Sequence, residues 1–469
     1  MGVFIAGSHI YSESSRASSV NRASPNLGPD AFPCPIFLSL TMASPLYAIP
    51  LEIAEQILMF SHPRDVARIS QTCRQFHVLV YKADQYLWRE LFLSYPFDHP
   101  KRSYRFTSQQ IKDFDWKEEL QRRVKAEIYI SSGKEGPELQ ESLLTLHSAV
   151  ATAADLTDSH QESYNIAWLS KLFHTASFLH SSTLEPSLRS LRAQLHSYLA
   201  LSYDETPLAQ SPTLRALRLQ SRCYVYDLRN YTRKTLWGPF IIDPNTNELI
   251  ANWEHIDHIV NVVIFNIRNL EDSPFQEACP KWNLEMTRAY SAPRSSERKP
   301  HDWAGAEGTW RRFISFMDYR ELFAFNYSSF GDGPRDQGYF QDDTIEEAVR
   351  VVEMRLKLVD NPTIAPEPFD DPEYPPLMYE GVARGMHSAN ADIKGVVRKY
   401  LNGTIRWTFL MFYEGVRQWS AEGVQVGNVC SASGIAGIWT GSEHQVGDPA
   451  GPFLMWRVAD ALMFNEHKE

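Results

Sequence analysis

The sequence predicts a multidomain α+β protein, with a small N-terminal module of three helices, a helical region, and a C-terminal antiparallel β-barrel or β-sandwich. Three observations support this prediction. The chain has 469 residues, more than a single hydrophobic core usually holds. Apolar residues recur every three or four positions in the first part of the chain. In parts of the last third they alternate with polar residues, as in strands with one buried face.

Residues 1–44 contain many serines and show neither helical nor strand periodicity, so they are expected to be a disordered extension. Met42 lies just before the first patterned segment. It is therefore a second possible start of translation beside Met1.

Residues 45–93 are predicted to form a small helical module. Pro50 and Pro63 divide this stretch into short segments, and apolar residues recur at helical spacing within each segment. Helices this short expose more apolar surface than they can bury among themselves. The module is therefore expected to bind a partner protein that covers the remaining apolar side chains.

Residues 104–270 are predicted to be mainly helical. Four apolar stripes have helical spacing and are expected to pack on one another. No fixed repeat length emerges, which favours an irregular helical layer, with a few armadillo-like pairs as the alternative. The alternating charges of residues 115–123 indicate a solvated helix face. The stripes consist of Leu143, Leu146, Val150, Ala153; Ile166, Leu169, Phe173, Ala176; Leu188, Leu191, Leu195, Tyr198; and Ile256, Val260, Ile264, Ile267.

Residues 300–460 are predicted to be rich in strands. Residues 308–327 are aromatic and suit a hairpin, and strict alternation predicts strands at 348–359 and 404–413. Residues 362–376 contain prolines and acidic residues and are expected to form an exposed loop. Many short strands joined by glycine-rich turns favour a barrel or a sandwich, and closure into a barrel would leave no exposed edges.

Charge and cysteine content restrict the function. The net charge of −11 argues against binding to nucleic acid or to an anionic membrane, and no apolar run is long enough to span a bilayer. The five cysteines are far apart in the sequence and form no CxxC pair. Reduced thiols are expected, and with them a cytoplasmic or nuclear location.

The N-terminal module resembles the F-box family. An Ile-Pro pair stands where the family usually has Leu-Pro, and the segments "EI", "IL", "PRDVARIS", "TCRQF" and "LWRELF" follow before residue 93. The resemblance implies docking onto a Skp-type adaptor that is attached to a cullin scaffold with a RING subunit. Each apolar residue of the pattern could instead serve the internal packing of the module. The implied adaptor contacts are Ile49, Pro50, Ile53, Ile57, Leu58, Val66, Ile69, Phe76, Leu87 and Trp88.

The C-terminal region resembles the receptor regions of fungal F-box proteins, through the segments 302–326, 403–415, 418–441 and 448–458. Its Gly-x-Trp opening, at Gly308 and Trp310, is similar to that of lipocalin-like barrels. Such a barrel implies a receptor for a target protein or, alternatively, a carrier of a small ligand tethered through the F-box. The candidate wall or mouth residues, which could equally be core aromatics and a surface arginine, are Trp310, Arg406, Trp407, Trp419 and Trp439.

The sequence lacks the common catalytic motifs, including GxSxG, the P-loop, HExxH and a dinucleotide-binding glycine fingerprint. His255 and His258 lie in an apolar helical segment without a third ligand at a recognised spacing. His444 and Asp448 are similarly isolated, and a turn or surface role is expected for them. We therefore expect a non-catalytic protein with no cofactor and no metal ion.

Overall fold

The computed structural model describes residues 49–103, 106–134, 136–154, 163–175, 184–199, 212–268, 301–328, 335–342, 344–360, 363–385, 390–427, 429 and 434–458. The described residues from Leu51 onwards form one compact unit. The predicted N-terminal extension, Met42, Cys34, Cys279 and Cys430 lie outside the described residues. Among the described residues, the other two cysteines, Cys73 and Cys223, form no disulfide bond.

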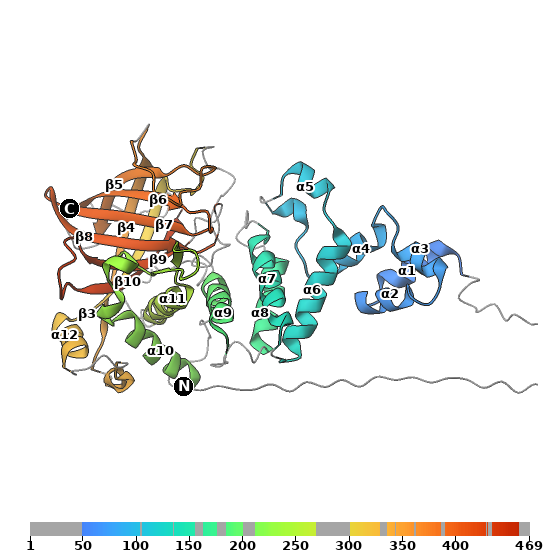
Figure 1. The fold of residues 1–469 in the computed structure, drawn as a ribbon, viewed down its shortest axis with the longest axis horizontal. Helices are drawn as coiled ribbons and strands as arrows, with labels where there is room; N and C mark the ends of the chain where they lie inside the picture. The colour runs from blue at the N-terminus through green and yellow to red at the C-terminus, as the bar shows by residue number, and fades with distance from the viewer. Residues whose placement is uncertain are drawn as a thin grey trace, which may run out of the picture. The chain divides into compact units, whose positions relative to one another are not determined.

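The N-terminal module forms four short helices instead of the three that were predicted. Pro63 begins the second helix, and the Cys73 thiol accepts a hydrogen bond from the Phe76 amide at the start of the third. Gln85, in the left-handed backbone region at φ 52°, separates the third helix from the fourth. The helices are α1 (Leu51–Met59), α2 (Pro63–Ile69), α3 (Arg74–Val80) and α4 (Tyr86–Ser94), as drawn in Figure 1.

The central region is helical, as predicted. The described members of its apolar stripes are mostly buried; for example, Leu143, Leu169 and Ile256 are fully buried, whereas Leu188 and Leu191 are half-buried. Ala176 lies outside the described residues. A short hairpin of β1 (Phe240–Ile242) and β2 (Leu249–Ala251) interrupts the helices. The helices are α5 (Ser108–Lys112), α6 (Trp116–Ser131), α7 (Glu138–Ala151), α8 (Tyr164–Thr175), α9 (Pro186–Leu199), α10 (Pro212–Val225) and α11 (Trp253–Arg268).

A buried polar network joins the segment after α4 to three helices of this region. The Asp98 carboxylate is buried and accepts hydrogen bonds from the amides of Ala154 (2.8 Å), Tyr164 (2.9 Å) and Asn165 (3.4 Å), and from the Ser163 hydroxyl. The Asn165 side-chain oxygen in turn accepts from the Asp98 amide and from the Arg123 guanidinium. The network therefore satisfies backbone donors at the end of α7 and the start of α8.

The expectation of a solvated charged face on residues 115–123 is wrong at Arg123. This side chain is buried, donates to Glu119 over 2.7 Å and to Asn165 over 2.8 Å, and lies over the Phe97 ring. Alternating charges cannot reveal burial, because a long arginine side chain can enter a core once carboxylate and amide partners meet it there.

Two histidines of the central region, the buried His255 and the half-buried His147, are neutral at neutral pH. The His147 ring lies 2.9 Å from the Leu191 carbonyl oxygen, and burial lowers its pKa to about 4. Burial also lowers the pKa of His255 to about 3, and the positive charge of nearby His258 acts in the same direction. Protonation of either ring would place a charge in an apolar environment.

Stability is therefore expected to fall in acid. An unfolded histidine titrates near pH 6.5, so below that pH the unfolded chain binds protons that the folded protein does not. Each histidine should cost up to about 1.4 kcal/mol of unfolding free energy for each pH unit between about 6.5 and about 4. Urea midpoints at pH 7 and pH 5 test this expectation. His147→Gln should reduce the pH dependence, whereas His77→Gln, a change at an exposed ring, should leave it as in the wild type; equal slopes for both variants would contradict it.

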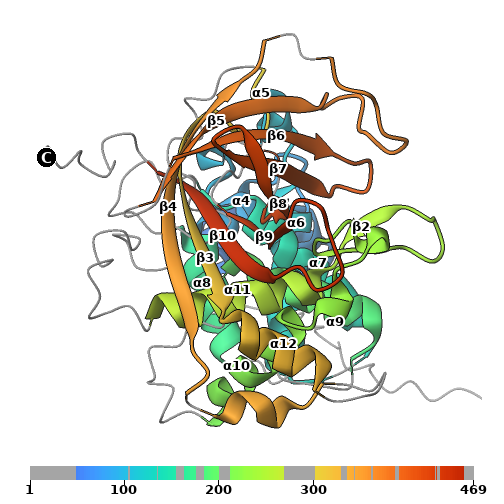
Figure 2. The same ribbon diagram turned by 90° about the vertical axis from the view of Figure 1, so that its left-hand side faces the viewer.

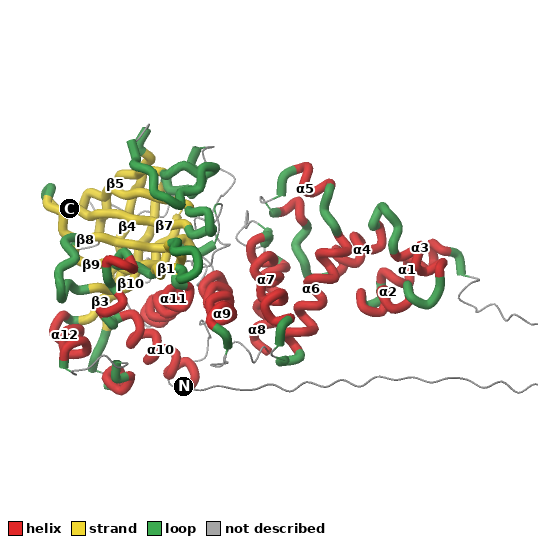
Figure 3. Tube along the Cα trace, in the orientation of Figure 1, coloured by secondary structure: helices red, strands yellow, loops and turns green. Residues whose placement is uncertain are grey.

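The C-terminal region is a closed barrel of eight antiparallel strands, drawn in yellow in Figure 3. Closure comes from β10, which pairs with both β9 and β3, so the barrel has no free edge. The strands are β3 (Gly308–Met317), β4 (Glu347–Leu358), β5 (Leu377–Gly385), β6 (Ala391–Lys399), β7 (Ile405–Tyr413), β8 (Val416–Gln425), β9 (Ile435–Gly441) and β10 (Ala450–Val458).

The two segments with strict alternation are β4 and β7, as predicted. Along β7 every second side chain from Ile405 to Met411 is buried, and the residues between them are half-buried. Glu414 and Gly415 both have positive φ and turn the chain tightly into β8. Residues 363–376 form the irregular loop that the prolines predict.

The prediction of a hairpin at residues 308–327 is only half right. The first part is β3, but the second part is a helix, α12 (Tyr319–Tyr327). Asp318 caps this helix by accepting a hydrogen bond from the Arg320 amide, and Leu322 and Phe325 are buried at a spacing of three residues. The helical spacing of the buried residues was not recognised in the sequence, because the many aromatic residues in this segment also favour a strand.

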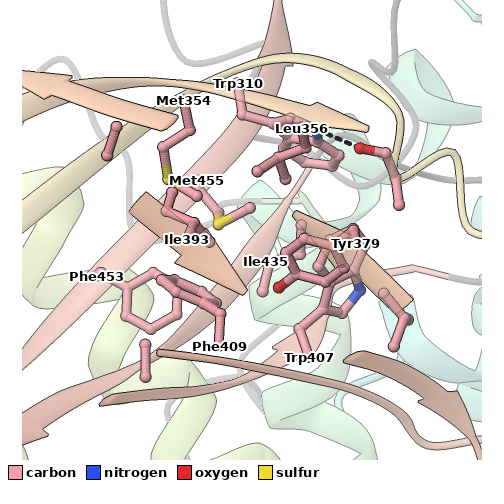
Figure 4. Close-up of a cluster of buried hydrophobic side chains, with 14 of the residues drawn as sticks. Trp310, Met354, Leu356, Tyr379, Ile393, Trp407, Phe409, Ile435, Phe453 and Met455 are labelled. Carbon is pink, nitrogen blue, oxygen red and sulfur yellow. Dashed lines mark hydrogen bonds between the residues drawn. The ribbon is translucent and has the colours of Figure 1, made fainter. Parts of the chain in front are cut away.

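The barrel interior holds a cluster of buried apolar side chains, shown in Figure 4. Trp310 and Trp407 are fully buried, with ring centroids 5.3 Å apart, and the Tyr379 ring lies 5.4 Å from that of Trp407. On the outside, α11 packs along β10, β9 and β3 (Figure 2), and the Asn266 amide donates to the Ser315 hydroxyl over 3.0 Å. The barrel therefore has both an apolar core and a helical cover.

Candidate protein-interaction surfaces

The residues expected to contact the adaptor fall into two groups. Five are buried in the protein's own core: Leu58, Val66, Phe76, Leu87 and Trp88. The other five reach the surface: Pro50, Ile53 and Ile57 are exposed, and Ile49 and Ile69 are half-buried. In this structure, only the second group can meet a partner without rearrangement of the module.

Trp88 illustrates why sequence patterns do not separate the two groups. Its indole nitrogen donates to the Val80 carbonyl over 2.7 Å, and its ring stacks near Tyr81. Its helix, α4, packs on α1 and α6. An apolar residue at helical spacing can face either a partner or the rest of the chain, and for Trp88 the tertiary packing decides that it faces the rest of the chain.

Three exposed apolar side chains form what we call the α1 apolar face. Ile53 and Ile57 are 52% and 53% exposed, and Phe60, just after the helix, is 91% exposed. Their spacing of four and then three residues places them along one side of the helix. Phe60 was absent from the sequence-based set, although its spacing from Ile57 could have identified it.

A hollow of about 580 Å³ adjoins α1. It is lined by the end of α3 and the turn after it, and includes the exposed Val78 side chain. The Lys82 ammonium lies 3.2 Å from the Glu55 carboxylate, which links the lining of the hollow to α1. Val78 is a second apolar residue that the family pattern did not indicate. The lining residues are His77, Val78, Tyr81, Lys82, Ala83 and Asp84.

The candidate receptor residues of the barrel are divided in a similar way. Trp310 and Trp407 are core residues, whose indole nitrogens donate to the Ala306 carbonyl and the Gln425 side chain. Arg406 alternates with Trp407 along β7 and therefore lies on the outer face. From the sequence, Arg406 and Trp407 fall in one candidate set, but neighbouring side chains on a strand point to opposite faces of the sheet.

Arg406 is held by a bidentate ion pair. Its Nε and Nη2 atoms each lie 2.8 Å from one oxygen of the Glu422 carboxylate, and Nη1 donates to the Tyr400 hydroxyl over 3.2 Å. Burial alone would lower the pKa of Arg406, but the Glu422 carboxylate outweighs burial and raises it. The guanidinium is therefore paired within the outer face of the barrel, where it links β7 to β8.

One end of the barrel, where β3 begins, is closed by the chain itself. Ala304 and Ala306 are fully buried and belong to the interior cluster. The Asp302 carboxylate accepts hydrogen bonds from the amides of Ala306 (2.7 Å) and Glu307 (3.0 Å), and the Trp303 indole donates to the Pro375 carbonyl over 2.7 Å. Residues 302–307 therefore form a plug at this end.

The opposite end, where β3, β5, β7 and β9 terminate, we call the rim. Trp419 and Trp439 are half-buried here and meet edge to face, with ring centroids 5.2 Å apart. The Trp439 indole donates to the Ser315 carbonyl over 3.1 Å. Of the five candidate receptor residues, these two are the ones that line an accessible part of the barrel.

The histidines singled out in the sequence have structural contacts. His255 contacts the Tyr231 hydroxyl, and His258 lies 3.0 Å from the Ser221 hydroxyl. His444 stacks on Trp237, with ring centroids 3.9 Å apart. Within the described ranges, no group of three or more His, Cys, Asp or Glu residues is arranged to hold a metal ion.

The fold defines a protein with a helical N-terminal module, a helical region and a closed β-barrel. Residues 46–94 match the F-box-like family, so the chain carries an F-box-like domain at the position that its sequence pattern indicated. Comparisons with curated proteins and with solved structures find no match. No helix in the described part of the chain has the length and apolar character to cross a bilayer. The fungal and lipocalin-like resemblances stay predictions.

Proposed function

We propose that this protein is the substrate-recognition subunit of a Skp–cullin–F-box ubiquitin ligase. The observation that carries the proposal is the α1 apolar face, with three side chains more than half exposed on an F-box-like domain. Covering the exposed part of such a side chain stabilises a complex by about 1 kcal/mol for the half-exposed isoleucines and by about 2 kcal/mol for the almost fully exposed phenylalanine. A Skp-type adaptor is the partner that F-box domains imply, and through it the protein would join a cullin and a RING subunit.

In this proposal the protein performs no chemistry. It holds a target protein close to a ubiquitin-charged enzyme, and its contribution is proximity and orientation. The barrel is the proposed binding part for the target, and Trp419 and Trp439 at the rim are the candidate contacts, because they combine aromatic surface with partial exposure. The proposed location is the cytoplasm or the nucleus.

Direct binding to a purified Skp-type adaptor tests the proposal. The full-length protein and the adaptor, mixed at about 10 μM each, are expected to elute together in size-exclusion chromatography, which requires a dissociation constant of about 1 μM or lower and thus about 8 kcal/mol of binding free energy. The α1 apolar face would supply part of this free energy, and the remaining contacts of the interface would supply the rest. Separate elution of the two proteins at this concentration would refute the adaptor role.

A further inference from the structure

Arg312 lies inside the barrel. In the strand register it stands opposite Val352 on β4 and Met455 on β10, and both of these side chains belong to the buried interior cluster. Its side chain is 1% exposed. A guanidinium is one of the most costly groups to bury without a partner, so its position in an apolar core requires an explanation.

One edge of the Arg312 guanidinium has no partner. Nη1 lies 3.2 Å from the Met411 sulfur, a weak acceptor, and the group lies over the rings of Phe409 (4.9 Å) and Phe453 (4.4 Å). Nε and Nη2 are buried, and neither has a hydrogen-bond partner among the described residues. These two nitrogens form the edge with which arginine binds a carboxylate in bidentate fashion.

Within the described strands of the barrel, no acid is placed to pair with this edge. None of the inward positions of the eight described strands carries an aspartate or a glutamate. The nearby groups that bear on Arg312 are the phenols of Tyr413 and Tyr379. Burial lowers its pKa to about 9, so the group still carries a positive charge at neutral pH. The charged residues at inward positions are all basic: Arg312, Arg350, Lys399 and Arg457.

The rim is the side from which a ligand can approach. The inward residues beyond Arg312 on β3, Ile314 and Phe316, are half-buried, as are Tyr413, Trp419 and Trp439 on the facing strands. At the other end, residues 302–307 block the barrel. Met411, which contacts Arg312, has a flexible thioether side chain that can move aside.

We propose that the barrel binds a monocarboxylate with an apolar or aromatic body, and that the carboxylate pairs with the Nε and Nη2 edge of Arg312. The apolar body would lie against the rim aromatics. A single carboxylate matches the single free edge, and the apolar surroundings reject a second charge. This inference goes beyond the ligase proposal and does not depend on it, because it concerns only the barrel.

Calorimetric titration of the full-length protein tests the inference. The probes are 4-phenylbutyrate and the neutral 4-phenylbutanol, together with a hexapeptide ending in Leu-Phe as free acid and as C-terminal amide. At least one acid is expected to bind about 10- to 100-fold more tightly than its neutral counterpart, because a charge-assisted hydrogen bond would be lost. Preference for 4-phenylbutyrate identifies a small-molecule ligand, whereas preference for the peptide acid identifies a chain end.

Variants locate the site. Arg312→Met should reduce acid binding at least tenfold and Arg312→Lys should reduce it less, since lysine keeps the charge but loses the fork. Arg417→Met removes an exposed arginine that pairs with Glu443 and should leave binding unchanged. The inference is overturned if no acid binds at millimolar concentration, if acid and neutral probes bind equally, or if Arg312→Met binds as the wild type does. If Arg312→Met fails to fold, the acid and neutral probes on the wild type still decide.

Discussion

Replacing two side chains of the α1 apolar face by aspartate is expected to abolish capture of a Skp-type adaptor without unfolding the protein. In the variant Ile53→Asp, Ile57→Asp, two charges would stand where the proposed complex buries apolar surface. Each half-exposed isoleucine would contribute about 1 kcal/mol when covered, and each aspartate charge would have to be desolvated in the interface, so the pair should weaken binding more than about 100-fold. Both side chains are more than half exposed, so the fold of the free protein is expected to tolerate the two changes.

The measurement is a titration of the adaptor with each purified protein, alongside a thermal melt. Val416→Asp is the matched control, because Val416 is an equally exposed apolar residue on the barrel, in β8. It should bind the adaptor like the wild type. Unchanged affinity of the double variant, with an unchanged melt, would remove the α1 apolar face from the interface and with it the proposed mode of adaptor binding.

Asp98→Ala is expected to destabilise the protein by about 3–5 kcal/mol, since the removal of one partner from a buried charged network leaves the other polar groups unpaired. The carboxylate accepts from three backbone amides and one hydroxyl, and all of these donors would lose their acceptor at once. The Asn165 side-chain oxygen accepts hydrogen bonds from both the Arg123 guanidinium and the Asp98 amide, so the change would also disturb the hydrogen bonding of Arg123.

Urea denaturation of the full-length variant measures this effect as a lowered midpoint. Asp65→Ala serves as the control, because it removes a carboxylate whose ion pair with Arg68 is exposed, and such pairs contribute about 0–1 kcal/mol. A loss below about 1 kcal/mol for Asp98→Ala would show that water replaces the carboxylate, and that the network does not hold α7 and α8 together.

Local sequence patterns predicted much of the architecture correctly. The helical stripes around Leu143 and Ile256, and the alternation in β4 and β7, follow directly from the geometry of the helix and the strand, because each element turns a fixed period into one buried face. The F-box-like pattern likewise depends on the local spacing of a few apolar residues. Prediction was weaker at residues 319–327, where aromatic residues suit both a strand and a helix.

The sequence alone was therefore sufficient to place the F-box-like domain, the helical region and the β-rich region along the chain. Only the tertiary structure decided which apolar residues of the module are buried, that the β-rich region closes into a barrel, and that Arg312 points inward while Arg406 points outward. The physical reason is that burial and partner choice depend on segments far apart in the chain. The pairing of β10 with β3 closes the barrel, and the packing of α4 on α6 brings Phe92 against Trp116 and Arg123.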